Sequence, residues 1–216
     1  MEDKDANTPP LNLRKSREDR KISVRAGLLS AAAGILAKEG PTGLTLRRLA
    51  SEVGASTKVV YTFFGGKSGL LEAVYLHAFA GLGDALAASL AVDDPRQRLW
   101  FICKAYRAYA HRNRELYGVM FGDLARGYEP PVKSRRQAWE TFRTLRDTVR
   151  LCAPQLPVAQ VDLAARTLWA VMHGVVSLEL RQLLGGTSEG ADQTFDHAVS
   201  AVCTNFGLAN DTTVMA

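Results

Sequence analysis

A short segment of the chain, TKVVYT, presents side chains that suit contact with nucleic acid. Thr57 and Thr62 offer hydroxyls, Lys58 offers a cation, and Val59 and Tyr61 add a small apolar and an aromatic group. On the outer face of a helix, hydroxyls and a lysine can meet base edges and phosphates in a DNA major groove. These residue types therefore predict a DNA-reading helix, provided that the flanking elements expose this face.

Apolar spacing and caps around this segment predict two helices joined by a tight turn. Thr45 can cap a first helix whose apolar residues recur at i, i+3, i+4 and i+7, and Ser56 can cap a second. Gly54 can adopt a positive φ at no steric cost, so it suits the end of the first helix. Val60 and Phe64 would face inward from the second helix. The pattern indicates a helix-turn-helix unit.

The excess of positive charge lies in the first third of the chain. Residues 1–70 carry 12 Lys and Arg against 7 Asp and Glu, whereas residues 71–216 carry 15 of each. A basic end on a neutral body predicts a polyanionic partner for that end. We expect the basic run before the first helix either to lie along phosphates or in a minor groove, or to remain a mobile charged tail. This run consists of Arg14, Lys15, Arg17, Arg20 and Lys21.

At residues 45–71 the sequence resembles the TetR family of bacterial transcriptional regulators. The resemblance rests on many positions at fixed spacing, and the preceding helix and the chain length agree with it. The matching residues are Thr45, Leu46, Arg47, Leu49, Ala50, Gly54, Ala55, Ser56, Val60, Tyr61, Phe64, Lys67 and Leu70. Lys58 departs from the family, which often has glycine or another small residue there, so the base contacts of relatives do not carry over.

The resemblance implies that nine residues contact a near-palindromic DNA duplex, with repression more common than activation. They are Thr45, Arg47, Ser56, Thr57, Lys58, Val59, Tyr61, Thr62 and Lys67. Residues 57–59 would face bases, and residues 61, 62 and 67 would contact phosphates. The resemblance leaves Phe63 open between the core and a place near the DNA backbone.

Helical periodicity continues to the end of the chain, with no alternating stretch of useful length. We expect an all-α fold of about nine helices. Residues 1–20 would form a flexible basic arm, 21–66 a three-helix DNA-binding domain, and 67–210 a larger domain for ligand binding and dimerisation.

The last two expected helices, at 158–184 and 192–206, carry more apolar residues than one small domain can bury. Part of this surface should form a four-helix interface between two chains. The candidate residues are Val161, Ala165, Leu168, Met172, Val175, Leu178, Phe195, Val199, Val202 and Phe206.

Two features point to a ligand site in the larger domain. Residues 168–174, LWAVMHG, resemble a TetR-type C-terminal domain with Trp-x-x-x-His-Gly, and the helices before them are rich in large aromatic side chains. The resemblance implies a cavity there for a small, mostly hydrophobic effector, while a core built from aromatics is the other interpretation. The expected lining is Tyr106, Met120, Phe121, Trp139, Phe142 and Met172. His173 is either a hydrogen-bonded core histidine, which we favour, or a ligand-facing one.

Other classes of function find little support in the sequence. The four histidines show no metal-ligand spacing, the three cysteines lie far apart, and Gly66-Lys67-Ser68 lacks the rest of a phosphate-binding loop. We therefore expect no cofactor, no metal, no enzymatic activity and no membrane span, with a cytoplasmic location. Two alternatives stay open: a DNA-binding regulator without a small-molecule effector, and a small all-α enzyme.

Overall fold

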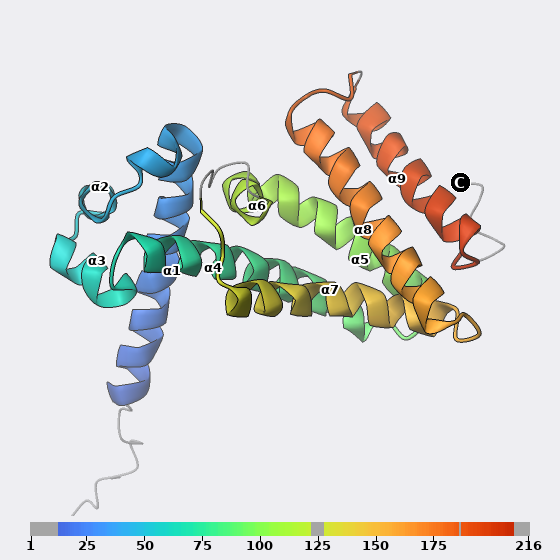
Figure 1. Cartoon of the computed structure of the whole chain (residues 1–216), viewed down its shortest axis with the longest axis horizontal. Helices are drawn as coiled ribbons and strands as arrows, with labels where there is room; N and C mark the ends of the chain where they lie inside the picture. The colour runs from blue at the N-terminus through green and yellow to red at the C-terminus, as the bar shows by residue number, and fades with distance from the viewer. Residues whose placement is uncertain (1–12, 122–127, 186, 210–216) are drawn as a thin grey trace, which may run out of the picture.

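The computed structural model describes residues 13–121, 128–185 and 187–209, and the elements in these residues are all helical (Figure 1). This confirms the expected all-α fold. In chain order the elements are α1 (Leu13–Gly43), α2 (Leu46–Glu52), α3 (Thr57–Phe64), α4 (Lys67–Ala87), the 3₁₀ helix η1 (Ala88–Ala91), α5 (Pro95–Arg112), α6 (Arg114–Met120), α7 (Val132–Cys152), α8 (Val158–Leu180) and α9 (Ser188–Asn205).

The first three helices form a small bundle at one end of the molecule (Figure 1). Leu36 of α1, Leu49 of α2 and Val60 of α3 are fully buried in it. Phe64 is also buried, as expected, and Phe63 is half-buried against the same core. Burial of this inner face fixes which side of α3 remains outward.

The first helix begins earlier than the sequence analysis predicts. Residues 13–20 belong to α1, although we expected them in the flexible arm. Residues 11–21 contain no Gly or Pro and are mostly good helix formers, so local propensity extends the helix. The rest of the expected arm, residues 1–12, lies outside the described residues. At the other end, Gly40 has a φ of 69° and breaks the helical path before Pro41.

The fourth helix is the centre of the larger domain. It packs against α1, α5, α6 and α7. Its inward residues include Leu70, Val74, Ala78 and Leu82. Within the described residues, Lys67–Ala91 is the one segment whose length and hydropathy would allow it to cross a membrane. Its central place in the bundle accounts for its apolar character.

The last two helices pack side by side at the end of the molecule opposite α3 (Figure 1). Arg107 of α5 ties them to the bundle: its Nε donates to Glu179 of α8 at 2.8 Å, and its Nη1 lies 2.6 Å from Asp192 of α9. The hydrogen bond from Arg107 is the main cause that lowers the pKa of the Glu179 carboxyl. The pair is therefore ionised and holds three helices together.

Most of the residues that we expected at a dimer interface lie instead in the core of one chain. Val161, Ala165, Leu168, Met172, Phe195 and Val199 are buried, Val175, Val202 and Phe206 are half-buried, and Leu178 is exposed. The sequence analysis expected only part of this set at an interface, and four of the candidates are indeed not fully buried, but their contact with a second chain stays a prediction. Because α8 is apolar around most of its circumference, hydropathy alone cannot tell which face meets the core. The outer face of α8 carries Leu163, Ala170, Gly174 and Leu178, at i, i+7, i+11 and i+15, and of these the sequence analysis named Leu178.

The three cysteines are buried and unpaired. Burial raises the pKa of the Cys152 thiol to about 12 and that of the Cys203 thiol to about 11, and it raises the pKa of the Cys103 thiol well above its usual value. Because the thiolate is the reactive form, we expect the native thiols to react with a disulfide reagent at pH 8 at least about a hundredfold more slowly than a free thiol. Denaturation in guanidinium should restore fast reaction of all three. Fast reaction of the native protein would contradict the burial.

Candidate DNA-binding surface and ligand pocket

The nine residues expected to contact DNA all lie exposed on the helix-turn-helix surface. They come from α2 and its cap, from α3 and its cap, and from the start of α4. Tyr61 is 59% exposed and Val59 is 41% exposed, although both are large apolar or aromatic side chains. Exposed apolar groups on a short helix that also carries a lysine are typical of a binding face rather than of a solvated one. Their role in DNA binding stays a prediction.

The predicted caps fix the two helices of this unit. The Thr45 hydroxyl accepts a hydrogen bond from the Arg48 backbone N–H at 3.0 Å, and the Ser56 hydroxyl accepts one from the Val59 backbone N–H at 3.3 Å. Gly54, with a φ of 64°, follows α2 as expected. Caps of this kind each contribute about 1 kcal/mol. The turn is therefore set by local sequence.

The outward side chains of α3 differ in whether they form hydrogen bonds or ion pairs with other residues of the chain. The Thr62 hydroxyl donates to the Lys58 backbone carbonyl oxygen at 2.8 Å. Within the described residues, the side chains of Thr57, Lys58 and Tyr61 have no hydrogen-bond or ion-pair partner. These three are therefore available to a partner molecule, and Thr62 is already engaged.

The start of α4 is locked against the end of α3. A Cβ at Gly69 would lie 2.1 Å from the Phe64 backbone carbonyl oxygen, closer than any real contact, so a larger residue would force the two helices apart. Phe64 itself is buried in the small core. Movement of the first turn of α4 is therefore passed to α3.

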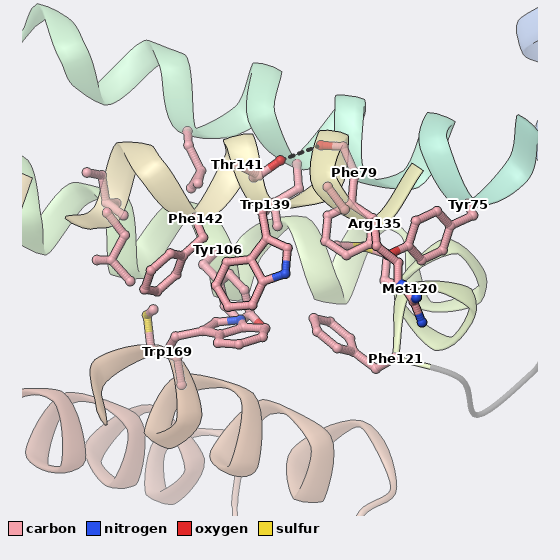
Figure 2. Close-up of a pocket in the computed structure, with 16 residues that line it drawn as sticks. Tyr75, Phe79, Tyr106, Met120, Phe121, Arg135, Trp139, Thr141, Phe142 and Trp169 are labelled. Carbon is pink, nitrogen blue, oxygen red and sulfur yellow. Dashed lines mark hydrogen bonds between the residues drawn. The ribbon is translucent and has the colours of Figure 1, made fainter. Parts of the chain in front are cut away.

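An aromatic pocket of about 180 Å³ lies between α4, α5, α7 and α8 (Figure 2). The structure brings all six predicted lining residues to it, namely Tyr106, Met120, Phe121, Trp139, Phe142 and Met172. A volume of this size argues against the other interpretation, a solidly packed aromatic core, since well-packed interiors hold few voids larger than a water molecule. Ligand binding by these residues stays a prediction.

The sequence analysis missed ten further lining residues. They are Tyr75, Phe79, Leu82, Leu86, Ile102, Arg135, Ala138, Thr141, Leu145 and Trp169. The four from α4 recur at i, i+4, i+7 and i+11, so the helical period could have found them once one was placed. Arg135 lies one turn before Trp139 on the same face of α7, and Trp169 belongs to the Trp-x-x-x-His-Gly segment itself.

Two consecutive hydrogen bonds connect three side chains behind the wall of the pocket. The Tyr106 and Tyr117 hydroxyl oxygens are 2.9 Å apart, and the Tyr117 hydroxyl lies 2.8 Å from Nδ1 of His173. Burial is the main cause that raises the pKa of Tyr106, so its phenol stays protonated. His173 does not line the pocket and stacks on Phe121 with ring centroids 4.2 Å apart. The favoured interpretation of His173, a hydrogen-bonded core residue, agrees with this geometry.

A bundle with an exposed helix-turn-helix face at one end and a hollow aromatic core in a larger helical domain has the architecture of a helical DNA-binding regulator. The family model described as "Bacterial regulatory proteins, tetR family" matches residues 28–74, and the one described as "Tetracyclin repressor-like, C-terminal domain" matches residues 100–202. The chain belongs to the TetR family of transcriptional regulators, as the resemblance implied. The family consists of regulators and not of enzymes.

Relatives and solved structures agree with this assignment. The HTH-type transcriptional regulator BetI of Burkholderia thailandensis is 30% identical over 180 residues, which are 82% of this chain and 87% of the relative. The TetR-family regulator PfmR from Thermus thermophilus has a TM-score of 0.61 at 23% identity, over 81% of this chain and 94% of PfmR. A TetR variant from Acinetobacter baumannii AYE, solved with minocycline, has a TM-score of 0.58 at 21% identity, over 83% and 94% of the two chains. The two solved structures support the fold.

Proposed function

We propose that this protein is a cytoplasmic, dimeric repressor that leaves its operator when a small, mostly hydrophobic molecule fills the aromatic pocket. The observation that carries the proposal is the position of α4, which directly follows α3 and supplies Tyr75, Phe79, Leu82 and Leu86 to the pocket wall. The N-terminal part, residues 21–66, would read DNA, and residues 67–210 would bind the ligand and the second chain. The A. baumannii TetR variant was solved in complex with minocycline, which supports a small-molecule ligand for this protein.

The mechanism is a shift between two arrangements of the DNA-reading helices. A ligand that binds better when α4 holds the two α3 helices at a spacing unsuited to DNA must weaken operator binding by the same factor. The close contact of Gly69 with Phe64 makes α3 follow α4. Direct repacking of α4 by the ligand is therefore sufficient, with no further relay.

Two features support a dimer: the recognition helix is short, and the outer face of α8 carries exposed apolar side chains. One short recognition helix reads few base pairs, so a two-fold pair is expected to read two half-sites. On α8, Leu163 is 55% exposed and Leu178 is 43% exposed. Between them, a Cβ at Gly174 would meet nothing within 4 Å in the isolated chain. A partner helix can approach closely at this point.

Selection of bound DNA from a random duplex library with the purified protein tests the proposal. We expect a near-palindromic sequence to be enriched. The affinity for that sequence should fall linearly on a log–log plot against salt, with a slope of about −0.9 for each phosphate that is neutralised. Equal affinity for random and selected duplexes at every salt concentration would contradict the DNA-binding assignment.

A ligand screen tests the second half of the proposal. A compound that fills the pocket should raise the melting temperature, because it binds the folded protein only, and should release the selected operator over the same concentration range. A compound that raises the melting temperature and leaves operator affinity unchanged would contradict the coupling through α4.

A further inference from the structure

Arg135 and the phenol of Tyr75 lie together at one end of the aromatic pocket. Figure 2 shows Tyr75 and Arg135 at one end, Phe142 at the other, and Trp139 and Trp169 between them. Trp139 is 51% exposed and Arg135 is exposed, so this wall opens to solvent. The pocket is therefore amphipathic along its length, and a ligand that fills it lies with a polar group toward Arg135.

Arg135 determines which charge on a ligand is favourable at this end of the pocket. It is the one charged side chain among the lining residues that the structure describes, and none of the ion pairs in that part of the chain includes it. The Glu72 carboxylate lies close to this end, where it accepts a hydrogen bond from the Ser134 hydroxyl at 2.5 Å, but it does not line the pocket. The charge of Arg135 acts on the Tyr75 phenol and partly offsets the rise in its pKa that burial causes. An anion placed here would meet a guanidinium and a phenolic donor together.

The volume limits the apolar part of the ligand. A cavity of about 180 Å³ is slightly larger than an engineered apolar cavity of about 150 Å³ that holds benzene. It therefore accommodates one aromatic ring or an alkyl body of similar bulk. The surrounding aromatic rings could equally stabilise a quaternary ammonium, but the guanidinium of Arg135 repels a cation, and no acidic side chain lines the described pocket.

We propose that the effector is a small monocarboxylate with a hydrophobic body of about one aromatic ring, whose carboxylate pairs with Arg135 and whose body lies between Trp139, Trp169 and Phe142. This inference rests on the proposed ligand response and adds the chemical class of the ligand. Arg135 acts as the specificity-determining residue, and the aromatic residues supply most of the binding energy by burial.

Three probes with the same body and different charge test this class: 3-phenylpropionate, 3-phenylpropanamide and trimethyl(3-phenylpropyl)ammonium, with octanoate as a second carboxylate. Binding is followed by calorimetry and by tryptophan fluorescence, because Trp139 and Trp169 line the pocket. We expect at least one of the two carboxylates to bind at least about tenfold more tightly than the neutral amide, and the ammonium compound to bind most weakly.

Variants of Arg135 separate a paired carboxylate from a merely hydrophobic ligand. Arg135→Gln should weaken carboxylate binding about tenfold and leave amide binding unchanged, and Arg135→Lys should recover part of the loss. Arg136→Gln is the matched control, because Arg136 is the adjacent exposed arginine on α7 and does not line the pocket.

The outcomes distinguish this inference from the proposed function. If the amide or the ammonium compound binds as tightly as the carboxylates and releases operator DNA, the ligand response stands and the carboxylate class is overturned. The class is also overturned if Arg135→Gln leaves the preference for the carboxylate unchanged. If neither carboxylate binds at millimolar concentration while selected DNA is still bound, the carboxylate class is overturned, whereas the ligand response is judged by the wider ligand screen.

Discussion

Replacing Tyr61 by alanine should lower the affinity for the selected operator about a hundredfold. Tyr61 is 59% exposed on α3, and within the described residues its hydroxyl has no partner, so a phosphate oxygen can accept its hydrogen bond. One such contact is worth about 1.4 kcal/mol, and a two-fold dimer makes it twice. Because the side chain lies outside the core, the melting temperature of the free protein should stay unchanged. Fluorescence anisotropy with labelled operator measures the loss.

Companion variants show which part of Tyr61 acts. Tyr61→Phe keeps the ring and should reproduce most of the loss if the hydroxyl binds phosphate. Phe101→Ala is the matched control, because Phe101 is also an exposed aromatic residue, at 51%, but lies on α5 of the other domain. Operator affinity that is unchanged in Tyr61→Ala would remove α3 from the DNA interface.

Lys58 should behave differently from Tyr61 because it can reach both base edges and phosphates. Lys58→Ala is expected to change which bases the selection enriches. A phosphate contact by this residue would also reduce the magnitude of the salt slope by about 2, one for each chain of the dimer. A weaker affinity with unchanged base preference and unchanged slope would contradict a direct role.

The helix-turn-helix unit was predictable because local sequence determines it. The hydroxyls of Thr45 and Ser56 cap the helices that immediately follow them, and Gly54 is placed where only a positive φ continues the chain. Each of these effects acts within about one helical turn. The inward set of Val60 and Phe64 then leaves one outer face for DNA. The residues that determine these caps and this turn are neighbours in the sequence, so their roles can be inferred without the structure.

The larger domain was less predictable because its arrangement depends on contacts between distant segments. The six lining residues on α5 to α8 were found because their side chains are large and aromatic or flexible, whereas the four on α4 were not predicted to line a pocket. Nothing local distinguishes Leu82, which lines the pocket, from Leu70, which does not, although both are buried leucines of α4. Arg135 was missed for the same reason, because a single arginine on a solvated helix carries no sign of the cavity beside it.

The face of α8 that we propose for contact with a second chain shows this limit more clearly. Leu168 and Leu178 are the same residue type on the same helix, yet Leu168 is fully buried in the chain and Leu178 is 43% exposed. Only the packing of α8 against α5 and α7 decides between them. That packing leaves Gly174 on the outer face, where it costs about 1 kcal/mol of helix stability relative to alanine. Close approach of a second chain would offset this cost.

Gly174→Trp should therefore separate the dimer into folded monomers and weaken operator binding by a factor of about 10² to 10⁴. In the isolated chain a Cβ at this position meets no atom within 4 Å, so we expect helical content and probe binding in the pocket to persist. In the dimer it would be forced between the two α8 helices. The loss of affinity follows because two linked half-site contacts bind as one event, whereas separate monomers must bind independently. Light scattering at micromolar concentration and operator titration measure the two effects. Leu151→Trp, which introduces the same side chain at an exposed position on α7, should leave both unchanged. A Gly174→Trp protein that stays dimeric with full operator affinity would place the interface on another surface.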